Sequence, residues 1–178
     1  DLSEPFVEGA RYLTERTGLG KLVNFETGSA LALPFDDGRF DTVLLQHVAM
    51  NIADRSRLYT EIRRVLKSSG RFGTFDVVLK AGEPIYPLPW ARTPVTSFLM
   101  TAAETGDAIE RHGFRTLAWH DDTETAKAWF AELRASGPPP SPNLGVVMGP
   151  DVAELAGNLG RNLAQGRLGI LTAVFEAA

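Results

Sequence analysis

The sequence predicts an α/β fold built on a mainly parallel sheet. Residues 40–47 form a nearly continuous apolar run of strand-forming residues, which is typical of a strand buried on both faces. A helical pattern follows, with Leu58 and Ile62 on one face, and then a second strand pattern at residues 71–79. A strand, a helix and a strand in this order indicate a βαβ crossover. Since the alternation continues toward the end of the chain, we expect residues 1–178 to form a single α/β domain.

The residues before position 40 carry shorter signals. Ser3 is a good N-cap for a helix, and Gly18 is a plausible residue to end it. Residues 22–26 have the composition of a short strand, residues 28–34 that of a loop and residues 36–38 that of a turn. We therefore expect one helix and one strand before the βαβ crossover.

The crossover helix and the segment after it have clear boundary residues. Asp54 can cap the helix, and the Ser-Ser-Gly sequence at residues 68–70 is expected to end it. Residues 82–94 contain four prolines, so we expect an irregular loop there. Thr101 and Glu104 have the spacing of a capping box, which predicts that the next helix begins at this point.

The C-terminal part alternates in the same way. Residues 114–120 are expected to form a strand, and a helix is expected from about Thr123. The Gly-Pro-Pro-Pro sequence at residues 137–140 is the strongest helix breaker in the chain. Pro150 favours the first turn of another helix, and residues 168–175 are expected to form the last strand.

Composition limits the class of protein. The 18 basic and 22 acidic residues give a net charge of −4, and the basic residues are scattered, so we do not expect a nucleic-acid partner. The absence of cysteine excludes disulfides, a thiolate nucleophile and cysteine metal sites. The longest apolar stretches are too short to span a membrane, and no charged and apolar leader opens the chain. We therefore expect a cytoplasmic globular domain.

Candidate ligand-binding residues follow the predicted strands. In an open α/β sheet, ligands bind beyond the carboxyl ends of the strands. The residues at such positions are Asp1, residues 28–31, residues 46–51, and the loop that carries Tyr86 and Trp90. A carboxylate at a strand end can accept two hydrogen bonds from a ribose diol. Asp1 could therefore bind a ligand. The alternative is that it binds none and is only an acid that flanks a helix at a frayed terminus.

Three segments resemble one known family. They read DLSEPFVEGARYL (1–13), GSALALPFDDGRFDTVLLQHVAMNI (28–52) and RLYTEIRRVLKSSGRF (57–72). Together they are similar to the class I S-adenosylmethionine-dependent methyltransferases, in particular the small-molecule, type 11-like group with an LPF, acidic turn, FD, apolar strand and His pattern. The resemblance covers residues 1–80 by motif and continues more weakly to the end of the chain.

This resemblance implies a partial Rossmann-like methyltransferase sheet, mostly parallel with an antiparallel last strand and with helices on both faces. The glycine-rich loop of the family would precede Asp1, so the chain is predicted to be an N-terminally truncated copy that lacks the first strands. Gly18 and Gly20 follow a helix instead of a strand and do not replace that loop. Residues 121–167 are predicted to form a helical cover over the acceptor site, inserted before the last strand.

The resemblance also assigns residues to the cofactor S-adenosylmethionine. Asp1 corresponds to the acid that holds both ribose hydroxyls, and Leu2 packs on the adenine. Ser29 stands where the family usually has an aspartate for the adenine amino group, so it can accept a hydrogen bond but brings no charge. Ala30 supplies a backbone N–H to the adenine ring, and Leu31 forms a wall beside it.

The residues after the buried strand are assigned to the reactive part of the cofactor. Gln46, His47 and Val48 resemble the segment that passes the methionine portion and the methyl group. His47 could accept a proton from an amine or a hydroxyl of the acceptor. The alternative is a hydrogen-bonded lining residue without a catalytic role.

Acceptor contacts are predicted from three residues. Tyr86 and Trp90 lie where the family gathers acceptor-binding residues, and Asn51 lies in the loop after His47. An aromatic wall can attract a cationic ammonium group, and ordinary core packing is an equally good reading of these rings. The other aromatic pair, Trp129 and Phe130, has helical spacing on a face that we expect to be buried in the core.

No metal site is expected. His120 is followed by two adjacent acids, Asp121 and Asp122, whose side chains would point to opposite sides of an extended strand. One histidine with such a pair makes a poor metal site.

The leading hypothesis is methyl transfer from S-adenosylmethionine to a small-molecule acceptor by in-line displacement. The sulfonium is already activated, so the protein needs mainly to align the two reactants and exclude water. Without the glycine-rich loop, this chain could be inactive. The alternative is a non-enzymatic fold remnant or protein-interaction module that associates through an exposed sheet edge, with a homodimer as one form. A nicotinamide-dependent dehydrogenase is disfavoured because no tyrosine has a lysine four residues later.

Overall fold

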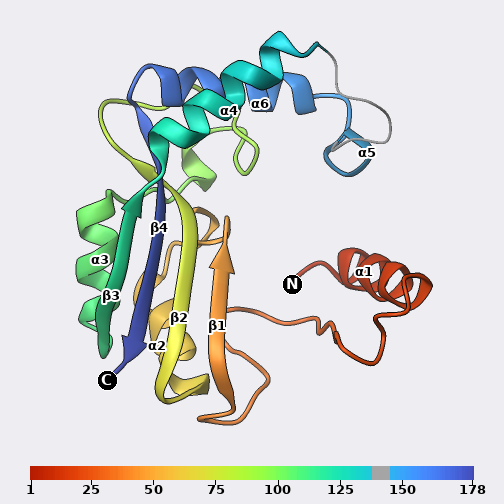
Figure 1. The fold of residues 1–178 in the computed structure, drawn as a ribbon, viewed down its shortest axis with the longest axis vertical. Coiled ribbons are helices and arrows are strands. Elements are labelled where there is room, and N and C mark those ends of the chain that lie inside the picture. The colour runs from red at the N-terminus through yellow and green to blue at the C-terminus, as the bar shows by residue number, and fades with distance from the viewer. Residues whose placement is uncertain (138–144) are drawn as a thin grey trace.

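The computed structural model describes residues 1–137 and 145–178. Four strands form one sheet in the order β1-β2-β4-β3 (Figure 1). The first pair is parallel, and β4 runs antiparallel to both of its neighbours, so three strands point in one direction and the last one in the other. This confirms the predicted α/β class with an antiparallel last strand. The strands are β1 (Phe40–Gln46), β2 (Leu66–Leu79), β3 (Phe114–Asp121) and β4 (Leu168–Ala177).

The helices take different places around the sheet. The pair α2 and α3 covers one face, α4 and α6 lie beyond the carboxyl ends of β1, β2 and β3, and α1 lies apart, on the β1 side (Figure 1). Two 3-10 turns cover Ala49–Asn51 and Pro94–Thr96. None of the helices in the described ranges has both the length and the apolar character that crossing a bilayer requires. The helices are α1 (Glu4–Arg16), α2 (Arg55–Val65), α3 (Ala102–Glu110), α4 (Thr123–Ala135), α5 (Gly145–Met148) and α6 (Val152–Ala164).

Two apolar clusters lie on opposite faces of the sheet. Successive residues of a strand point to opposite faces, so a strand buried on both faces supplies both clusters. In β4, Ala173 and Phe175 join the cluster beneath α2 and α3, while Leu168 and Ile170 join the cluster beneath α4 and α6. The strands predicted at 40–47 and 168–175 are present as β1 and β4. The expected burial of the first on both faces is wrong: in β1 only Leu45 is buried, because the strand lies at an edge of the sheet.

Local signals in the sequence place most helices correctly. Asp54 caps α2 by accepting a hydrogen bond from the amide of Arg57 at 2.8 Å. The capping box of α3 is complete: the Thr101 hydroxyl accepts from the Glu104 amide at 3.2 Å, and the Glu104 carboxylate accepts from the Thr101 amide at 2.8 Å. α4 ends at Ala135, before the predicted breaker, of which residues 138–140 lie outside the described part.

Two predicted elements are wrong. Residues 22–26 form no strand: Arg11 donates to the Phe25 carbonyl at 3.1 Å, and the amino group of Asp1 donates to the Glu26 carbonyl at 3.1 Å. A strand needs a neighbouring strand for its amides and carbonyls, and in the described chain this segment lies beside none.

The helix end predicted at residues 68–70 is also wrong. α2 ends at Val65, and residues 68–70 belong to β2. The pairing with β1 shifts register here, because Phe40 lies opposite Leu66 whereas Thr42 lies opposite Arg71. Extra residues on one strand are the mark of a bulge, so Ser-Ser-Gly serves as an irregularity within the strand instead of a turn before it.

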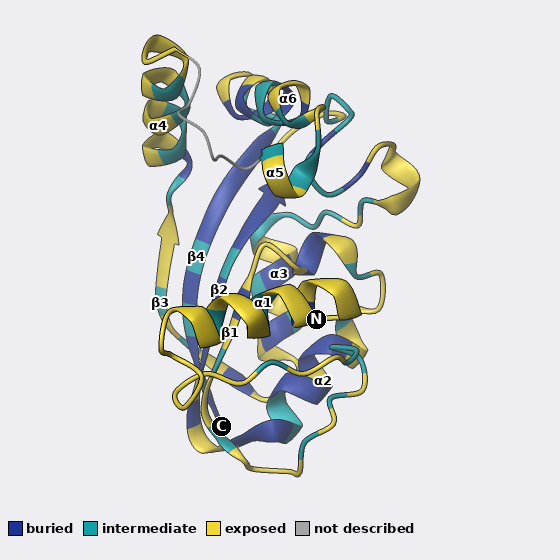
Figure 2. Cartoon of the chain, turned by 90° about the vertical axis from the view of Figure 1, so that its right-hand side faces the viewer, coloured by how far each residue is buried: buried dark blue, intermediate teal, exposed yellow. Residues whose placement is uncertain are grey.

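The N-terminal region is the least buried part of the chain (Figure 2). In α1 only Val7 is buried, while Phe6 and Leu13 are 60% and 63% exposed. On the edge strand β1, Leu44 is 78% exposed. Exposed apolar side chains that occur together in this way indicate a surface for contact with another molecule.

Candidate active site

The turn after β1 brings the first candidate residues to the carboxyl end of the sheet. β1 ends at Gln46, and His47 has a left-handed backbone with φ of 52°. The His47 amide donates to the Phe75 carbonyl at 2.9 Å, and the two rings lie 4.7 Å apart between centroids. Residues in this backbone region are uncommon outside glycine and often occur at functional sites. The turn therefore holds His47 in a defined place, next to β2.

A buried carboxyl group supports this turn from below. Asp76 of β2 is 3% exposed, and its Oδ2 accepts from the Ala49 amide at 3.2 Å. Its other oxygen, Oδ1, has no hydrogen-bond partner among the described residues. Burial raises the pKa of Asp76 to about 6, although the amide of Ala49 and the charge of Arg55 act in the opposite direction. Asp76 thus fixes the 3-10 turn at residues 49–51 at the cost of desolvating its carboxylate.

His47 can act as a base at neutral pH. Desolvation of the ring lowers the pKa of His47 below its ordinary value. A histidine with a lowered pKa is an uncharged imidazole at pH 7, and the unprotonated ring nitrogen can accept a proton or a hydrogen bond. The imidazole thus has the chemistry that a proton acceptor needs.

A cavity of about 930 Å³ opens beside His47. It is bounded by the carboxyl end of the sheet, by the loop after β2 and by the helices α4 and α6 (Figure 1). Apolar and aromatic side chains make up most of its wall. The lining residues are His47, Met50, Asn51, Phe75, Val77, Pro89, Trp90, Asp122, Thr125, Ala126, Trp129, Phe130, Leu159 and Ile170.

The structure brings together some of the predicted acceptor residues. His47, Asn51 and Trp90 line this same cavity. Tyr86 does not line it, because its half-buried ring packs against the apolar cluster beneath α4 and α6. Trp129 is 55% exposed and lines the cavity, so its assignment to the core is wrong. Phe130 also lines the cavity while it packs against that cluster.

The sequence analysis missed the residues that hold the Trp90 loop. Asn162 of α6 accepts from the Ile85 amide through Oδ1 at 2.8 Å and donates to the Ile85 carbonyl through Nδ2 at 2.9 Å. Asn158, one turn earlier, donates to the Pro87 carbonyl at 2.8 Å. Both side chains are buried. The signal that could have found them is a pair of amides four residues apart on the apolar face of a predicted helix.

The far end of the same loop is attached to the turn after β1. The Phe98 amide donates to the Met50 carbonyl at 2.8 Å, and Arg55 donates to the Phe98 carbonyl at 2.9 Å. The indole of Trp90 donates to the Ser97 hydroxyl at 3.0 Å. The wall that carries Trp90 is therefore anchored both on α6 and on the segment that follows His47.

The predicted adenosine residues lie in a second, more open region near the N-terminus. The Gly28 amide donates to the Asp1 carbonyl at 2.9 Å, which sets Asp1 beside the loop that carries Ser29. Oδ1 of Asp1 accepts from the Ser3 amide at 2.7 Å. Leu2 is 76% exposed. The Ser29 hydroxyl accepts from the Leu31 amide at 3.1 Å, which closes the loop on itself.

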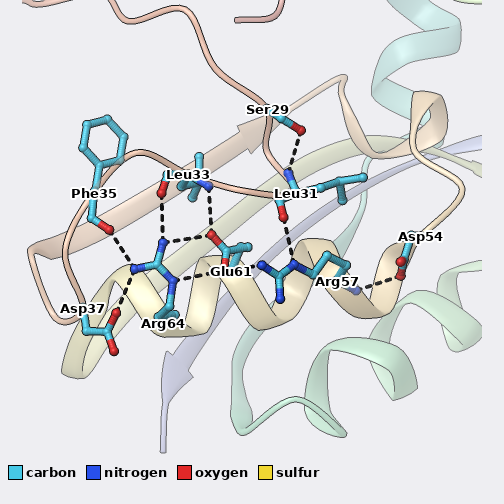
Figure 3. Close-up of polar contacts among 9 residues, drawn as sticks. All are labelled: Ser29, Leu31, Leu33, Phe35, Asp37, Asp54, Arg57, Glu61 and Arg64. Atoms are coloured by element: carbon cyan, nitrogen blue, oxygen red, sulfur yellow. Dashed lines mark hydrogen bonds and ion pairs between the residues drawn. The ribbon is translucent and has the colours of Figure 1, made fainter.

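Three side chains of α2 hold this loop (Figure 3). Near the start of α2, Arg57 donates to the Leu31 carbonyl at 2.8 Å. One turn later, Glu61 accepts from the Leu33 amide at 2.8 Å, and Arg64 donates to the Leu33 carbonyl at 3.0 Å. Because α2 begins shortly after the turn at the carboxyl end of β1, the contact with Arg57 holds Leu31 near that end of the sheet.

The ion pair at the centre of this network is partly buried. Glu61 is 3% exposed, and Oε2 lies 2.8 Å from Nη2 of Arg64. The hydrogen bond from Arg64 lowers the pKa of Glu61 to about 2, helped by the Leu33 amide and opposed by burial. Arg64 also forms an ion pair with Asp37 at 2.8 Å. A carboxylate that is ionised in this way keeps the loop in one position over the ordinary pH range.

Sequence comparison connects this fold to a known family. Residues 1–74 match the family described as methyltransferase domain. Over 84 residues the chain is 36% identical to the demethylmenaquinone methyltransferase of Symbiobacterium thermophilum, which covers 47% of this chain and 32% of that protein. Over 120 residues it is 31% identical to the ubiquinone/menaquinone biosynthesis C-methyltransferase of Hahella chejuensis, which covers 65% and 47%. The chain thus spans about a third to a half of the length of these relatives.

Solved structures support the same class. A geranyl diphosphate C-methyltransferase from Streptomyces coelicolor, solved with S-adenosyl-L-homocysteine, has a TM-score of 0.78 at 16% identity and covers 99% of this chain and 60% of that one. The [4+2]-cyclase SpnF has a TM-score of 0.71 at 24% identity, with 98% and 64% covered. At these identities the likeness concerns the fold alone. In sequence and in fold, the chain is thus similar to the S-adenosylmethionine-dependent methyltransferases. Its sequence relatives include quinone C-methyltransferases.

The residues near the N-terminus fit the adenosine part of S-adenosylmethionine. Each oxygen of the Asp1 carboxylate can accept two hydrogen bonds, so capacity for a ribose diol is left after the bond from Ser3. The Ala30 amide donates to no acceptor within the described chain. Gly18 and Gly20 follow α1 and lie in turns, so they do not form a glycine-rich loop between a strand and a helix. The fit therefore extends to the adenosine and not to the methionine tail.

The acids that follow His120 have separate partners in the part of the chain that is described. There, no three His, Asp or Glu side chains come together in a way that could hold an ion. In particular, Asp121 forms an ion pair with Lys80 at 2.7 Å, and Asp122 accepts from the Thr172 hydroxyl. These two acids are bound to different partners, so they do not act as a pair.

Proposed function

We propose that the protein functions in methyl transfer from S-adenosylmethionine to a small-molecule acceptor. The observation that carries this proposal is the position of His47. It follows β1 at the carboxyl end of the sheet, and its uncharged imidazole borders a cavity large enough for a small molecule. The match of residues 1–74 to a methyltransferase domain supports the same reaction.

The adenosine part of the cofactor is assigned to the N-terminal residues. When bound, S-adenosylmethionine supplies a methyl group already activated by its sulfonium charge. The Asp1 carboxylate accepts hydrogen bonds from the ribose hydroxyls, and Leu2 packs against the adenine. Ser29 and the Ala30 amide bind polar atoms of the ring, while Leu31 lies against its face. Because α2 holds this loop by backbone contacts, these groups are positioned before the ligand arrives.

The turn after β1 is assigned to the reaction itself. Gln46 and Val48 flank His47, and we assign the methionine portion to them although neither side chain lines the cavity. The acceptor atom forms its bond to the methyl carbon as the sulfur–carbon bond breaks, with the electron pair left on sulfur. For a hydroxyl or amine acceptor, the proton passes to the His47 imidazole. Apolar walls exclude water from this step, which favours transfer to the acceptor over hydrolysis.

The acceptor is assigned to the cavity under α4 and α6. Asn51 and Trp90 contact it directly, since both side chains line the space next to His47. Tyr86 acts from behind, as part of the packing that supports the Trp90 loop. Within residues 121–167, α4 and α6 act as a helical cover, because they supply the outer wall. Residues 138–144 of that range lie outside the described part.

Calorimetry with S-adenosyl-L-homocysteine tests the proposal. It is titrated into this chain and into the product of the complete reading frame. Binding by either chain, reduced about tenfold or more by Asp1→Ala in the chain that binds, is the expected result. Binding by neither chain would overturn the proposal.

A second candidate function rests on the exposed edge of the sheet. β1 is an edge strand whose outer side pairs with no other strand in the described chain, and Leu44 on this strand is exposed, as are Phe6 and Leu13 of α1. An unpaired edge with apolar side chains is a template for strand addition. We infer association of two copies through β1 as this second role. Light scattering at several concentrations tests it, and a particle that stays monomeric at high concentration contradicts it.

A further inference from the structure

The cavity beside His47 has an uneven distribution of polar groups. His47 and Asn51 follow β1 at one edge of the sheet, and Asp122 follows β3 at the other edge. Between them the floor is formed by Phe75 and Val77 of β2 and by Ile170 of β4, all apolar. Since β2 and β4 are the two inner strands, the cavity extends across the end of the sheet, with an apolar middle.

The wall opposite this floor is mostly apolar. Ala126, Trp129 and Phe130 come from α4, which also contributes Thr125 as its one polar lining residue, and Leu159 comes from α6. The rings of Trp129 and Phe130 lie edge to face, with centroids 4.9 Å apart. A ligand in the middle of the cavity therefore contacts carbon atoms on two sides, which favours an apolar body by the area removed from water.

No positive charge faces this cavity among its lining residues. Two cations near the cavity are engaged elsewhere: Arg92 pairs with Asp151 at 2.9 Å, and Lys80 pairs with Asp121 at 2.7 Å. Arg134, near the end of α4, is exposed and does not line the cavity. Arg55 donates to the Ile52 and Phe98 carbonyls. Burying a phosphate or carboxylate here would leave that anion without a partner, which is costly.

A cationic acceptor also has little to pair with. Asp122 is the one carboxylate in the lining, and it already accepts from the Thr172 hydroxyl. It lies at the end of the cavity away from His47, across the apolar floor. An ammonium group at the reacting end would therefore lose its hydration without gaining a counter-charge, and the aromatic rings offset only part of that loss.

We propose that the acceptor is a neutral, largely apolar molecule with one hydroxyl-type group, bound with that group at His47 and Asn51. The apolar body lies over Phe75 and Ile170, beneath α4. Asn51 suits this role because its amide offers both donors and an acceptor to the hydroxyl, although Nδ2 also donates to the Val48 carbonyl at 3.3 Å. That the bound molecule is a methyl acceptor rests on the proposed function. Its preferred binding to the cavity does not require the cofactor.

Three probes with one aromatic body test the preference. They are 1-naphthol, 1-naphthyl phosphate and a naphthyl trimethylammonium salt, each titrated calorimetrically into the full chain at pH 7.5. We expect 1-naphthol to bind at least tenfold more tightly than either charged probe. Equal or tighter binding of the phosphate, or of the ammonium salt, overturns the proposal, and so does an absence of naphthol binding.

A matched pair of variants locates the binding. Ala126→Trp fills the cavity from α4, whereas Ala128→Trp makes the same change on the exposed side of the same helix. We expect Ala126→Trp to weaken naphthol binding at least tenfold and Ala128→Trp to leave it unchanged, with both variants folded by circular dichroism. If both variants bind naphthol equally well, the probe lies elsewhere and the proposal is wrong.

These titrations separate the acceptor class from the reaction. They contain no S-adenosyl-L-homocysteine, so their outcome does not depend on whether the chain binds the cofactor. Naphthol binding without cofactor binding contradicts the proposed function alone. Cofactor binding with a preference for a charged probe contradicts the acceptor class alone.

Discussion

The two faces of the sheet are packed in opposite ways. Towards α2 and α3, Phe72 and Phe175 are fully buried and their rings are stacked 5.8 Å apart. On the other face of the same strands, Phe75 and Ile170 border a cavity of about 930 Å³. Residues of β2 supply both faces. One face is closely packed, which stabilises the fold, whereas the other leaves a cavity that can hold a small molecule.

The largest expected effect tests this comparison directly. Phe72→Ala removes a ring that contacts Tyr59, Phe114 and Phe175, and we expect a loss of about 3–5 kcal/mol in the free energy of unfolding. Phe75→Ala only enlarges an existing cavity, so we expect a loss of about 1–2 kcal/mol. Urea denaturation measures both. Equal losses would mean that the two faces do not differ in the way described.

The next effect concerns the wall of the cavity. Asn162→Leu keeps a side chain of similar size but leaves the amide and carbonyl of Ile85 without their partners. We expect a loss of about 2–3 kcal/mol in unfolding free energy, together with weaker naphthol binding. A loss of less than about 1 kcal/mol for Asn162→Leu, or unchanged naphthol binding, would contradict this role.

A third change tests the network on α2. Glu61→Gln is expected to destabilise the chain by about 2 kcal/mol at pH 7, because it weakens the hydrogen bonds with Arg64 and Leu33. The pKa of Glu61 is lowered to about 2, so its contribution is present above the ordinary value of 4.5 and is lost as the pH falls towards 2. The stability difference between the two proteins should therefore shrink below pH 4.5, measured by urea denaturation. Glu8→Gln on the exposed face of α1 is the control, and it should change little.

The last effect concerns Asp76, which lies on the same face of β2 as Phe72. Its raised pKa of about 6 means that its contribution is full below the ordinary value of 3.8 and is lost as the pH rises through 6. The stability of Asp76→Asn relative to the wild type should therefore increase by about 2 kcal/mol from pH 4 to pH 8. Thermal or urea unfolding at both pH values measures it. A difference that stays constant with pH would show that Asp76 is not a desolvated acid.

Local signals predicted more of the fold than of the site. Features with a signal within a few residues of the sequence are present in the structure. They are the cap at Asp54, the capping box at Thr101 and the strands at 114–120 and 168–175. The strand at 22–26 failed because a strand depends on a neighbour that the local sequence does not contain. Trp129 was misassigned for a related reason: helical spacing indicates an apolar face but not whether another element fills the space against it.

By itself the sequence determined the class of fold, the crossover from β1 to β2 and the end of the sheet at which His47 stands, because periodicity and capping act within a few residues. Only the tertiary structure decided the cavity and its walls. Two hydrogen bonds join Asn162 to Ile85, and these residues lie 77 positions apart in the sequence. Whether α4 closes onto the sheet or leaves a space depends on contacts at such distances, and no local pattern encodes them.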